Sequence, residues 1–435
     1  MSMVVKNNLG AVRTLNTLNK NSSALQKSLA KVSSGMKINS AQDDASGYAI
    51  SERMRVRIRS LDQANQNAQN DSSLMKTAEG AVGNTVELLR ALKEKAINAA
   101  NDSNTDEDRA TIQKEINQFI DQIDDNALVQ FNGKYLVDGS KNNATCATST
   151  VLLNQSLSTD TALDSALSTL KDRAGTSLGI QSSDTYMISW TNNGITSTTT
   201  GAVSAKLSAV IGLGGGTGVA GTSTDAIGTN KFGAEIYTPD KTAGIAVQAK
   251  GGAGVDNQLS GFTISILDQE GNVRKAANAA LDQFKQYQAA ENKTEGGAAS
   301  KSLNFQIGSE ANVAIKVGLG DMRAQALGLK GSTGEKISVA TKEKANGAIN
   351  VIENALTKAL DQQTTIGAIE ARLEYTQTNL TTSSENVQAA ESTIRDADMA
   401  KEMTNYTKNN VLLQSAQAML AQANQNSSAV LSLLQ

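Results

Sequence analysis

Residues 61–101, "LDQANQNAQNDSSLMKTAEGAVGNTVELLRALKEKAINAAN", keep one hydrophobic register along their whole length. Apolar or small residues recur at alternating steps of three and four, which is typical of a helix that packs against other helices. The positions of this seam are Leu61, Ala64, Ala68, Asp71, Met75, Ala78, Val82, Thr85, Leu89, Leu92, Ala96 and Ala99. The pattern predicts a helix of roughly 60 Å at 1.5 Å per residue. The many small seam residues indicate close neighbours on more than one side.

A second helix and a hairpin are predicted directly after this seam. Thr105 is suited to cap a helix whose first turn carries Asp106, Glu107 and Asp108, because carboxylates are favourable at the positive end of the helix dipole. One face of this helix is apolar, through Ile112, Ile116, Phe119, Ile120 and Ile123. Further on, Asn132-Gly133 between Phe131 and Tyr135 indicates a hairpin turn.

Both ends of the chain carry amphipathic helical patterns. The N-terminal stripe is Val5, Leu9, Val12, Leu15, Leu18, Leu25, Leu29 and Val32, and the glycines and short polar residues of 33–51 interrupt it. Towards the C-terminus, Ile349, Ile352, Leu356 and Leu360 are followed by Ile366, Ile369, Leu373 and Leu380. A last seam then runs to the chain end through Leu412, Ala416, Met419, Ala423, Asn426, Val430 and Leu433. Because chain ends are normally loose, such terminal stripes need a partner.

The region between the helical ends has a different character. Residues 138–303 are rich in Thr, Ser, Gly and Ala, and short strand-like pieces alternate with turns, as in 185–190, 234–238, 244–249 and 261–273. A helix is predicted over 275–293 and a glycine-rich loop over 212–221. Gly216, Gly218 and Gly221 match a dinucleotide-binding spacing, but no helix pattern or acidic partner follows, so we interpret this match as a chance occurrence. The predicted fold class is therefore mainly α, with a β-rich insertion between long helical ends.

Composition excludes several classes of function. The 40 basic and 43 acidic residues are interspersed, so no field favours nucleic acid or an anionic membrane. No apolar run approaches the roughly 18 residues of a membrane span, so we expect neither a membrane anchor nor a cleavable signal sequence. Histidine is absent and Cys146 is the one cysteine, which removes the usual hydrolytic and zinc-dependent chemistry. We therefore expect no enzyme activity, no cofactor and no metal.

Several stretches resemble bacterial flagellins. They are "SSGMKINSAQDDASGYAISERMR" (33–55) and "FNGKYLVDGS" (131–140) on one side, and 305–329, "STIRDADMAKEM" (392–403) and "AMLAQANQNSSAVLSLLQ" (418–435) on the other. The resemblance covers about residues 1–140 and 300–435 and leaves out the middle. It implies a secreted, extracellular structural subunit that polymerises with copies of itself into the flagellar filament. A hook–filament junction protein and a secreted coiled-coil adhesin are the alternatives, and a protease module in the insertion is a third.

The resemblance also implies a layered organisation and a set of partners. Residues 1–44 with 395–435 would form an inner tube, 45–140 with 300–394 an outer tube with the hairpin, and 141–299 a surface-exposed variable domain. The implied inner-tube seam is Val5, Leu9, Val12, Leu15, Leu18, Leu412, Met419, Ala423, Val430, Leu433 and Leu434, and the outer-tube seam is Leu61, Met75, Val82, Leu89 and Leu92. An export chaperone on the C-terminal helix, the flagellar secretion apparatus, and cap and junction proteins are the implied partners.

Two further expectations concern the free monomer. An isolated helix pair cannot bury enough apolar area to offset its ordering entropy, so the ends outside about residues 45–390 should order only on assembly. Flagellins detected by the Toll-like receptor for flagellin present an Arg, a Leu four residues later and a Glu on the next helix. Alignment without gaps places Ala91, Lys95 and Glu115 at these positions, so this receptor face is degenerate and weak signalling is expected.

Overall fold

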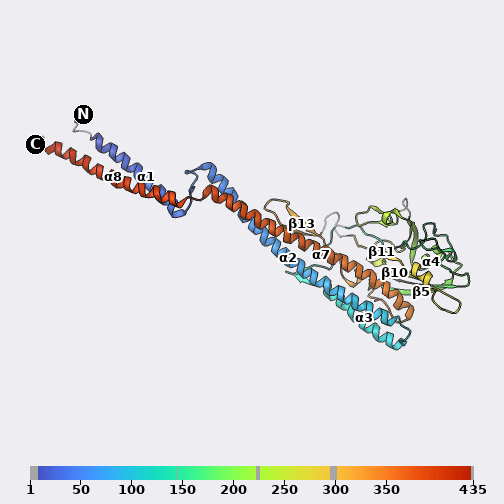
Figure 1. Cartoon of the computed structure of the whole chain (residues 1–435). Helices are drawn as coiled ribbons and strands as arrows, with labels where there is room; N and C mark the ends of the chain where they lie inside the picture. Colours follow the sequence, from blue (N-terminus) through green and yellow to red (C-terminus); the bar gives the residue numbers. More distant parts are fainter. Residues whose placement is uncertain (1–7, 144, 222–225, 294–300, 433–435) are drawn as a thin grey trace. The chain divides into compact units, whose positions relative to one another are not determined.

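The structure is a computed structural model that describes residues 8–143, 145–221, 226–293 and 301–432 (Figure 1). The chain divides into two compact units. The terminal unit comprises Met1–Ala68, Gln306–Val313 and Tyr375–Gln435, and the central unit comprises Gln69–Phe305 and Ala314–Glu374.

Long helices occupy both ends of the chain and a β-rich region lies between them, which confirms the predicted fold class. The long helices are α1 (Leu9–Ser34), α2 (Ala45–Ala99), α3 (Asp106–Ala127), α7 (Lys342–Arg395) and α8 (Met399–Ser432). The short helices are α4 (Leu207–Leu213), α5 (Lys275–Leu281) and α6 (Ala324–Leu327), with 3₁₀ turns at Leu167–Thr169, Pro239–Lys241 and Val255–Asn257. The strands are β1 (Gln130–Phe131), β2 (Lys134–Tyr135), β3 (Val151–Asn154), β4 (Thr185–Asn192), β5 (Ile195–Ala202), β6 (Gly216–Gly221), β7 (Gly228–Thr229), β8 (Glu235–Ile236), β9 (Gly244–Ala249), β10 (Leu259–Leu267), β11 (Lys285–Gln288), β12 (Leu303–Gln306) and β13 (Ala314–Val317).

The helical part of the central unit buries the seam that the sequence shows. Met75, Val82, Leu89 and Leu92 of α2 are completely buried, and full burial of each such side chain contributes about 1.5–3 kcal/mol. Ile116, Ile120 and Ile123 of α3 are buried as well, as are Val351, Ile352, Ile366 and Leu373 of α7. The stretch 349–380, which the sequence shows as two apolar groups, belongs to one continuous helix.

The N-terminus of α3 and the hairpin after it form as predicted. Thr105 Oγ1 accepts a hydrogen bond from the Asp108 N–H at 3.2 Å, and Asp108 Oδ2 accepts one from the Thr105 N–H at 3.0 Å. This reciprocal pair is a capping box, which satisfies two backbone donors that the helix leaves free. Strands β1 and β2 pair antiparallel across Asn132-Gly133, where both residues have positive φ.

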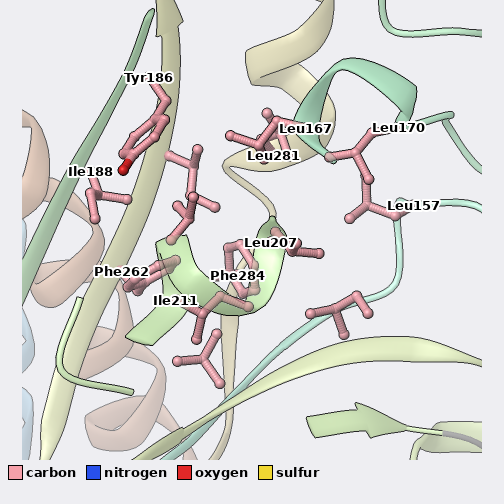
Figure 2. Packing of buried hydrophobic residues seen from close by; sticks show 14 of the residues in the cluster. Leu157, Leu167, Leu170, Tyr186, Ile188, Leu207, Ile211, Phe262, Leu281 and Phe284 are labelled. Atoms are coloured by element: carbon pink, nitrogen blue, oxygen red, sulfur yellow. The ribbon is translucent and has the colours of Figure 1, made fainter. Parts of the chain in front are cut away.

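The β-rich region has a core of its own (Figure 2). Strands β10, β4 and β5 form one antiparallel sheet, and β11, β3, β9 and β6 form another. Side chains from both sheets and from α4 and α5 meet between them, including Tyr186, Ile188, Phe262 and Leu281. The rings of Phe262 and Phe284 meet edge to face, with 5.2 Å between centroids. A hydrophobic core of its own is what an independently folded domain requires.

The first of these sheets also packs against α7 within the central unit. Asn354 Nδ2 donates to the Ser260 carbonyl at 2.8 Å, and Ser189 Oγ donates to the Glu343 carbonyl at 3.4 Å. Gly261 makes this close approach possible, because a Cβ added there would lie 2.7 Å from Val351 Cγ2. The face towards α7 is therefore small and polar, whereas the opposite face carries the apolar core.

Two sequence-based predictions in this region are wrong. The stretch 212–221 is not a loop, because its second half is strand β6, whose six residues pair with β9 from Gly216↔Ala249 to Gly221↔Gly244. Three of its six residues are glycines, which have no side chain to pack, so the strand gives no periodic signal. The predicted helix over 275–293 ends at Leu281, and Lys285–Gln288 form strand β11 on the edge of β3. Asn278 Oδ1 and Asp282 Oδ1 accept hydrogen bonds from the Ile266 and Ile264 N–H groups, which tie this end of α5 to β10.

Candidate assembly surface

Helices α1 and α8 pair antiparallel in the terminal unit, and polar side chains bridge them (Figure 1). Asn8 Nδ2 donates to the Ala423 carbonyl at 3.2 Å, and Asn21 Nδ2 donates to the Leu412 carbonyl at 3.1 Å. Asn409 on α8 donates to Ser28 Oγ at 2.9 Å. The sequence analysis did not anticipate these amide bridges, because asparagines on a helix usually indicate a solvated face.

The apolar side chains of this helix pair are largely uncovered. Among the described residues of α1 and α8, Ser28 and Ala416 alone are buried. Leu9, Val12, Leu15, Leu412 and Met419, which we call the terminal apolar set, are each 41–63 % exposed. Large exposed apolar patches are typical of interaction surfaces, which makes this set the candidate surface of the chain.

The other residues of the predicted inner-tube seam are distributed as follows. Leu18 and Ala423 are half-buried within the helix pair. Val430 lies in α8, and nothing is described of its side chain. Val5, Leu433 and Leu434 lie outside the described residues.

The predicted outer-tube seam occupies an entirely different environment. Leu61 packs with Ala64, Ala68 and Leu380 of the terminal unit and is 6 % exposed. Met75, Val82, Leu89 and Leu92 are fully buried in the central unit. These side chains stabilise the subunit itself, so they are not free to contact another molecule.

The three residues of the predicted receptor face lie on α2 and α3. Lys95 Nζ is 2.5 Å from Glu115 Oε2, so these two form an ion pair, and Ala91 is half-buried one turn before Lys95. The neighbours of this face are already engaged. Leu89 is fully buried, Lys93 is ion-paired to Glu353 of α7, and Arg90 Nη1 lies 2.6 Å from Glu87 Oε1.

A polar cavity of about 480 Å³ lies in the central unit beside α7. Its lining combines five basic with four acidic side chains, namely Lys231, Lys293, Lys301, Arg323, Lys358, Asp138, Glu291, Asp321 and Asp361. Lys358 Nζ donates to the Ala326 carbonyl at 2.9 Å, and burial lowers the pKa of this ammonium against the opposing charges of Glu291 and Asp321. Because the charges of the lining nearly balance, the cavity has little preference for an ion of either sign.

In the part of the chain that the structure describes, His, Cys, Asp and Glu side chains form no group of three or more that could hold a metal ion. No helix in the same residues combines the length and the apolar character needed to cross a membrane.

One residue with a structural role was missed by the sequence analysis. Arg395 is the last residue of α7 and is 6 % exposed, although arginine is rarely buried without a partner. The sequence does offer one indication of this role, because Arg395 lies between an apolar helix pattern and the acidic "DAD" of 396–398.

Known proteins match this chain along its whole length. The family model for the bacterial flagellin N-terminal helical region matches residues 5–142, and the model for the C-terminal helical region matches residues 349–434. A flagellin of Clostridium tyrobutyricum is 37 % identical over 97 % of this chain and 99 % of its own length. A flagellin of Bacillus subtilis is 30 % identical over 99 % of this chain and 100 % of its own length.

A solved structure of a flagellar hook-associated protein from Legionella pneumophila covers 78 % of this chain and 97 % of its own, with 16 % identity and a TM-score of 0.34. The two family models together span just over half of the chain, and the relatives span nearly all of it. The chain therefore belongs to the bacterial flagellin family.

Proposed function

We propose that this flagellin polymerises through α1 and α8, with the terminal apolar set buried between neighbouring subunits. Flagellins are the structural subunits of the extracellular flagellar filament, and this chain is one of them. The observation that carries the proposal is the exposure of Leu9, Val12 and Met419 on two helices that pair with each other.

The energetics favour assembly over an isolated helix pair. Burial of apolar surface contributes roughly 25 cal/mol per Å², and the exposed leucines, valine and methionine of the set offer that area to another subunit. A contact between different patches of identical subunits generates an open helical polymer when its rotation does not close into a ring. The same contacts would then order the ends of each subunit as it joins.

We further propose the layered organisation that the family resemblance implies. Residues 1–44 and 395–435 would form the inner layer, 45–140 and 300–394 the outer layer, and 141–299 the exposed domain. The separate apolar core of the β-rich region supports the last of these assignments. The complete burial of Met75, Val82 and Leu92 supports a subunit-stabilising role for the α2 seam.

Export partners complete the proposal. The apolar side chains of α8 would be protected by a chaperone before secretion and would be released for assembly afterwards. The one cysteine, Cys146, leaves the chain without an internal disulfide, which suits passage through the flagellar secretion channel. Cap and junction proteins would contact the same terminal helices at the ends of the filament.

Electron microscopy of purified monomer that is induced to polymerise tests the proposed function. A filament subunit should form long tubes without any other protein, and a junction protein should form short or no polymers. The full-length match to flagellins favours the first outcome over the junction alternative. If monomer with intact ends yields no long tubes when seeded with its own filament fragments, the proposal is wrong.

A further inference from the structure

The two chain connections of the terminal unit are bonded to each other. One connection, residues 35–44, joins α1 to α2, and the other, residues 396–398, joins α7 to α8. Met36 and Asp396 form an antiparallel bridge, the Lys37 N–H donates to the Arg395 carbonyl at 2.7 Å, and the Ala397 N–H donates to the Gly35 carbonyl at 3.0 Å. These backbone bonds tie together two segments that are about 360 residues apart in the sequence.

The side chain of Arg395 reinforces this junction from within. Its Nη1 donates to Glu52 Oε1 at 2.7 Å and lies 3.5 Å from Ser51 Oγ, and its Nε donates to Met36 Sδ at 3.0 Å. The guanidinium also lies over the ring of Tyr48, 5.6 Å from its centroid. One buried group at the end of α7 thus binds the first two turns of α2 and the connection before them.

The connection before α2 is built as an ordered turn. Gly35 ends α1 with a φ of 70°, and its N–H donates to the Lys31 carbonyl at 2.9 Å. Asp44 Oδ1 accepts from the Ser46 and Gly47 N–H groups, both at 3.0 Å, and Ile38 is 3 % exposed. Local hydrogen bonds and the buried Ile38 hold this turn, while Lys37 and residues 40–44 are exposed.

Charge favours the same arrangement. The hydrogen bond from Arg395 holds the pKa of the Glu52 carboxyl below its ordinary value, so Glu52 stays ionised opposite the guanidinium. Arg55, one turn further along α2, lies 3.3 Å from the same carboxylate oxygen. Its side chain is 41 % exposed, so it shares the carboxylate from the solvent side.

We propose that Arg395 is a positioning residue for filament assembly. Its guanidinium, bound to Glu52 and Met36 beneath the bonded connections, fixes the direction in which α1 and α8 leave α2 and α7. We call this arrangement the Arg395 clasp. When the direction of these helices is already fixed, they lose less conformational entropy as a neighbouring subunit binds their apolar side chains. The inference rests on the proposed assembly through these helices.

The test uses Arg395→Met and Glu52→Gln, with Arg55→Met as the matched control at the same carboxylate. Limited trypsin digestion of the monomer, read by mass spectrometry, reports the clasp without assembly. Lys37 lies inside the clasped connection, so trypsin should cut wild type on the N-terminal side no further than Lys31. In Arg395→Met and Glu52→Gln, trypsin should also cut the peptide bond after Lys37, and in Arg55→Met it should not.

Assembly is measured on the same variants as the critical concentration for seeded elongation. We expect it to rise at least fivefold in Arg395→Met and less than twofold in Arg55→Met. Arg395→Lys should rescue only part of the effect, because one ammonium cannot copy the planar donor fork. Thermal unfolding of the central unit should be unchanged in all variants.

Three results would overturn the inference. The first is that trypsin still does not cut after Lys37 in Arg395→Met. The second is that it does cut there but the critical concentration is unchanged. The third is that the Arg395 and Arg55 variants have equal effects. If wild type itself does not polymerise, the proposed function fails, while the trypsin pattern still reports whether the clasp exists.

Discussion

Lys95 of α2 and Glu115 of α3 form an ion pair, with 2.5 Å between Nζ and Oε2, on a partly exposed face of the central unit. Ala91 lies one turn before Lys95 on the same helix. The resemblance to flagellins that the Toll-like receptor detects implies an Arg, a Leu four residues later and a Glu on the next helix at this face. Here Glu115 is ion-paired to Lys95, and position 91 is an alanine instead of an arginine.

The first prediction is that the monomer signals weakly and that Ala91→Arg with Lys95→Leu restores signalling. The double change supplies a planar donor group and an apolar anchor and frees Glu115, and losing such groups from an interface centre typically costs several kcal/mol. A reporter-cell titration of depolymerised protein should show at least a tenfold gain in potency.

Arg90→Ala is the matched control for the receptor face. Arg90 is paired with Glu87, and a one-residue shift turns a helical side chain by about 100°, so this variant should leave potency unchanged. Strong signalling by the unmodified monomer, or no gain in the double variant, would show that the proposed face is wrong.

The second prediction concerns the terminal apolar set. Leu412→Asp with Met419→Asp should abolish polymerisation and leave the monomer as stable as wild type, because both side chains are exposed before assembly. A carboxylate buried between subunits without a partner costs several kcal/mol. Sedimentation measures assembly, and circular dichroism measures the fold.

Gln417→Asp is the control, because it places one carboxylate on the same helix, one residue away from the seam. It should impair assembly much less than the double variant. Normal filaments from Leu412→Asp with Met419→Asp would contradict burial of these side chains.

The third prediction is that the insertion is dispensable for assembly. Replacement of residues 141–299 by a short linker should still give filaments, because the insertion packs around its own core and carries none of the long seams. Val351 of α7 loses its contact with Gly261, so we expect some loss of thermal stability. A folded deletion protein that cannot form filaments would show that the insertion makes essential subunit contacts.

The fourth prediction is a pH dependence that arises at Asp71, a polar residue in the α2 seam. Desolvation raises the pKa of Asp71 to about 6, so the folded chain binds its proton more tightly than the unfolded chain does. This contribution to stability is present below pH 4 and is lost as the pH rises from about 4 to about 6.

Asp71→Asn removes the cost of holding an ionised carboxylate in this partly buried position at neutral pH. It should stabilise the protein by about 1–2 kcal/mol at pH 7.5 and by much less near pH 4, once the shift is reduced for partial exposure. Urea unfolding at the two pH values measures the difference, with the exposed Glu94→Gln as control. An equal effect at both pH values would mean that ionisation of Asp71 has no part in it.

Helices with a long apolar register could be predicted from the sequence, and elements held by the backbone could not. Met75, Leu89 and Ile116 repeat at helical spacing because packing requires it, and the structure buries each of them. The glycines of β6 are held by backbone pairing with β9, so they leave no side-chain pattern. The alternation of Lys285–Gln288 was obscured by the helix-like residues before it.

The candidate site divides in the same way. Leu9, Leu412 and Met419 could be predicted, because the regular spacing of an apolar stripe can be recognised in a single sequence. Arg395 and Glu52 are 343 residues apart, and a single sequence contains nothing that relates them. Polar contacts at such a separation depend on the fold, so the Arg395 clasp emerges only from the structure.

Hydrogen exchange of the same protein as monomer and as filament tests the central claim most directly. The amides of α1 and α8 should exchange fast in the monomer and become strongly protected in the filament, and those of residues 75–92 in α2 should be protected in both. The boundary should lie near Gly35 and Asp398 instead of the 45–390 expected from sequence, because the Arg395 clasp orders both connections. Equal protection of α1 and α8 in monomer and filament would contradict assembly through the terminal helices.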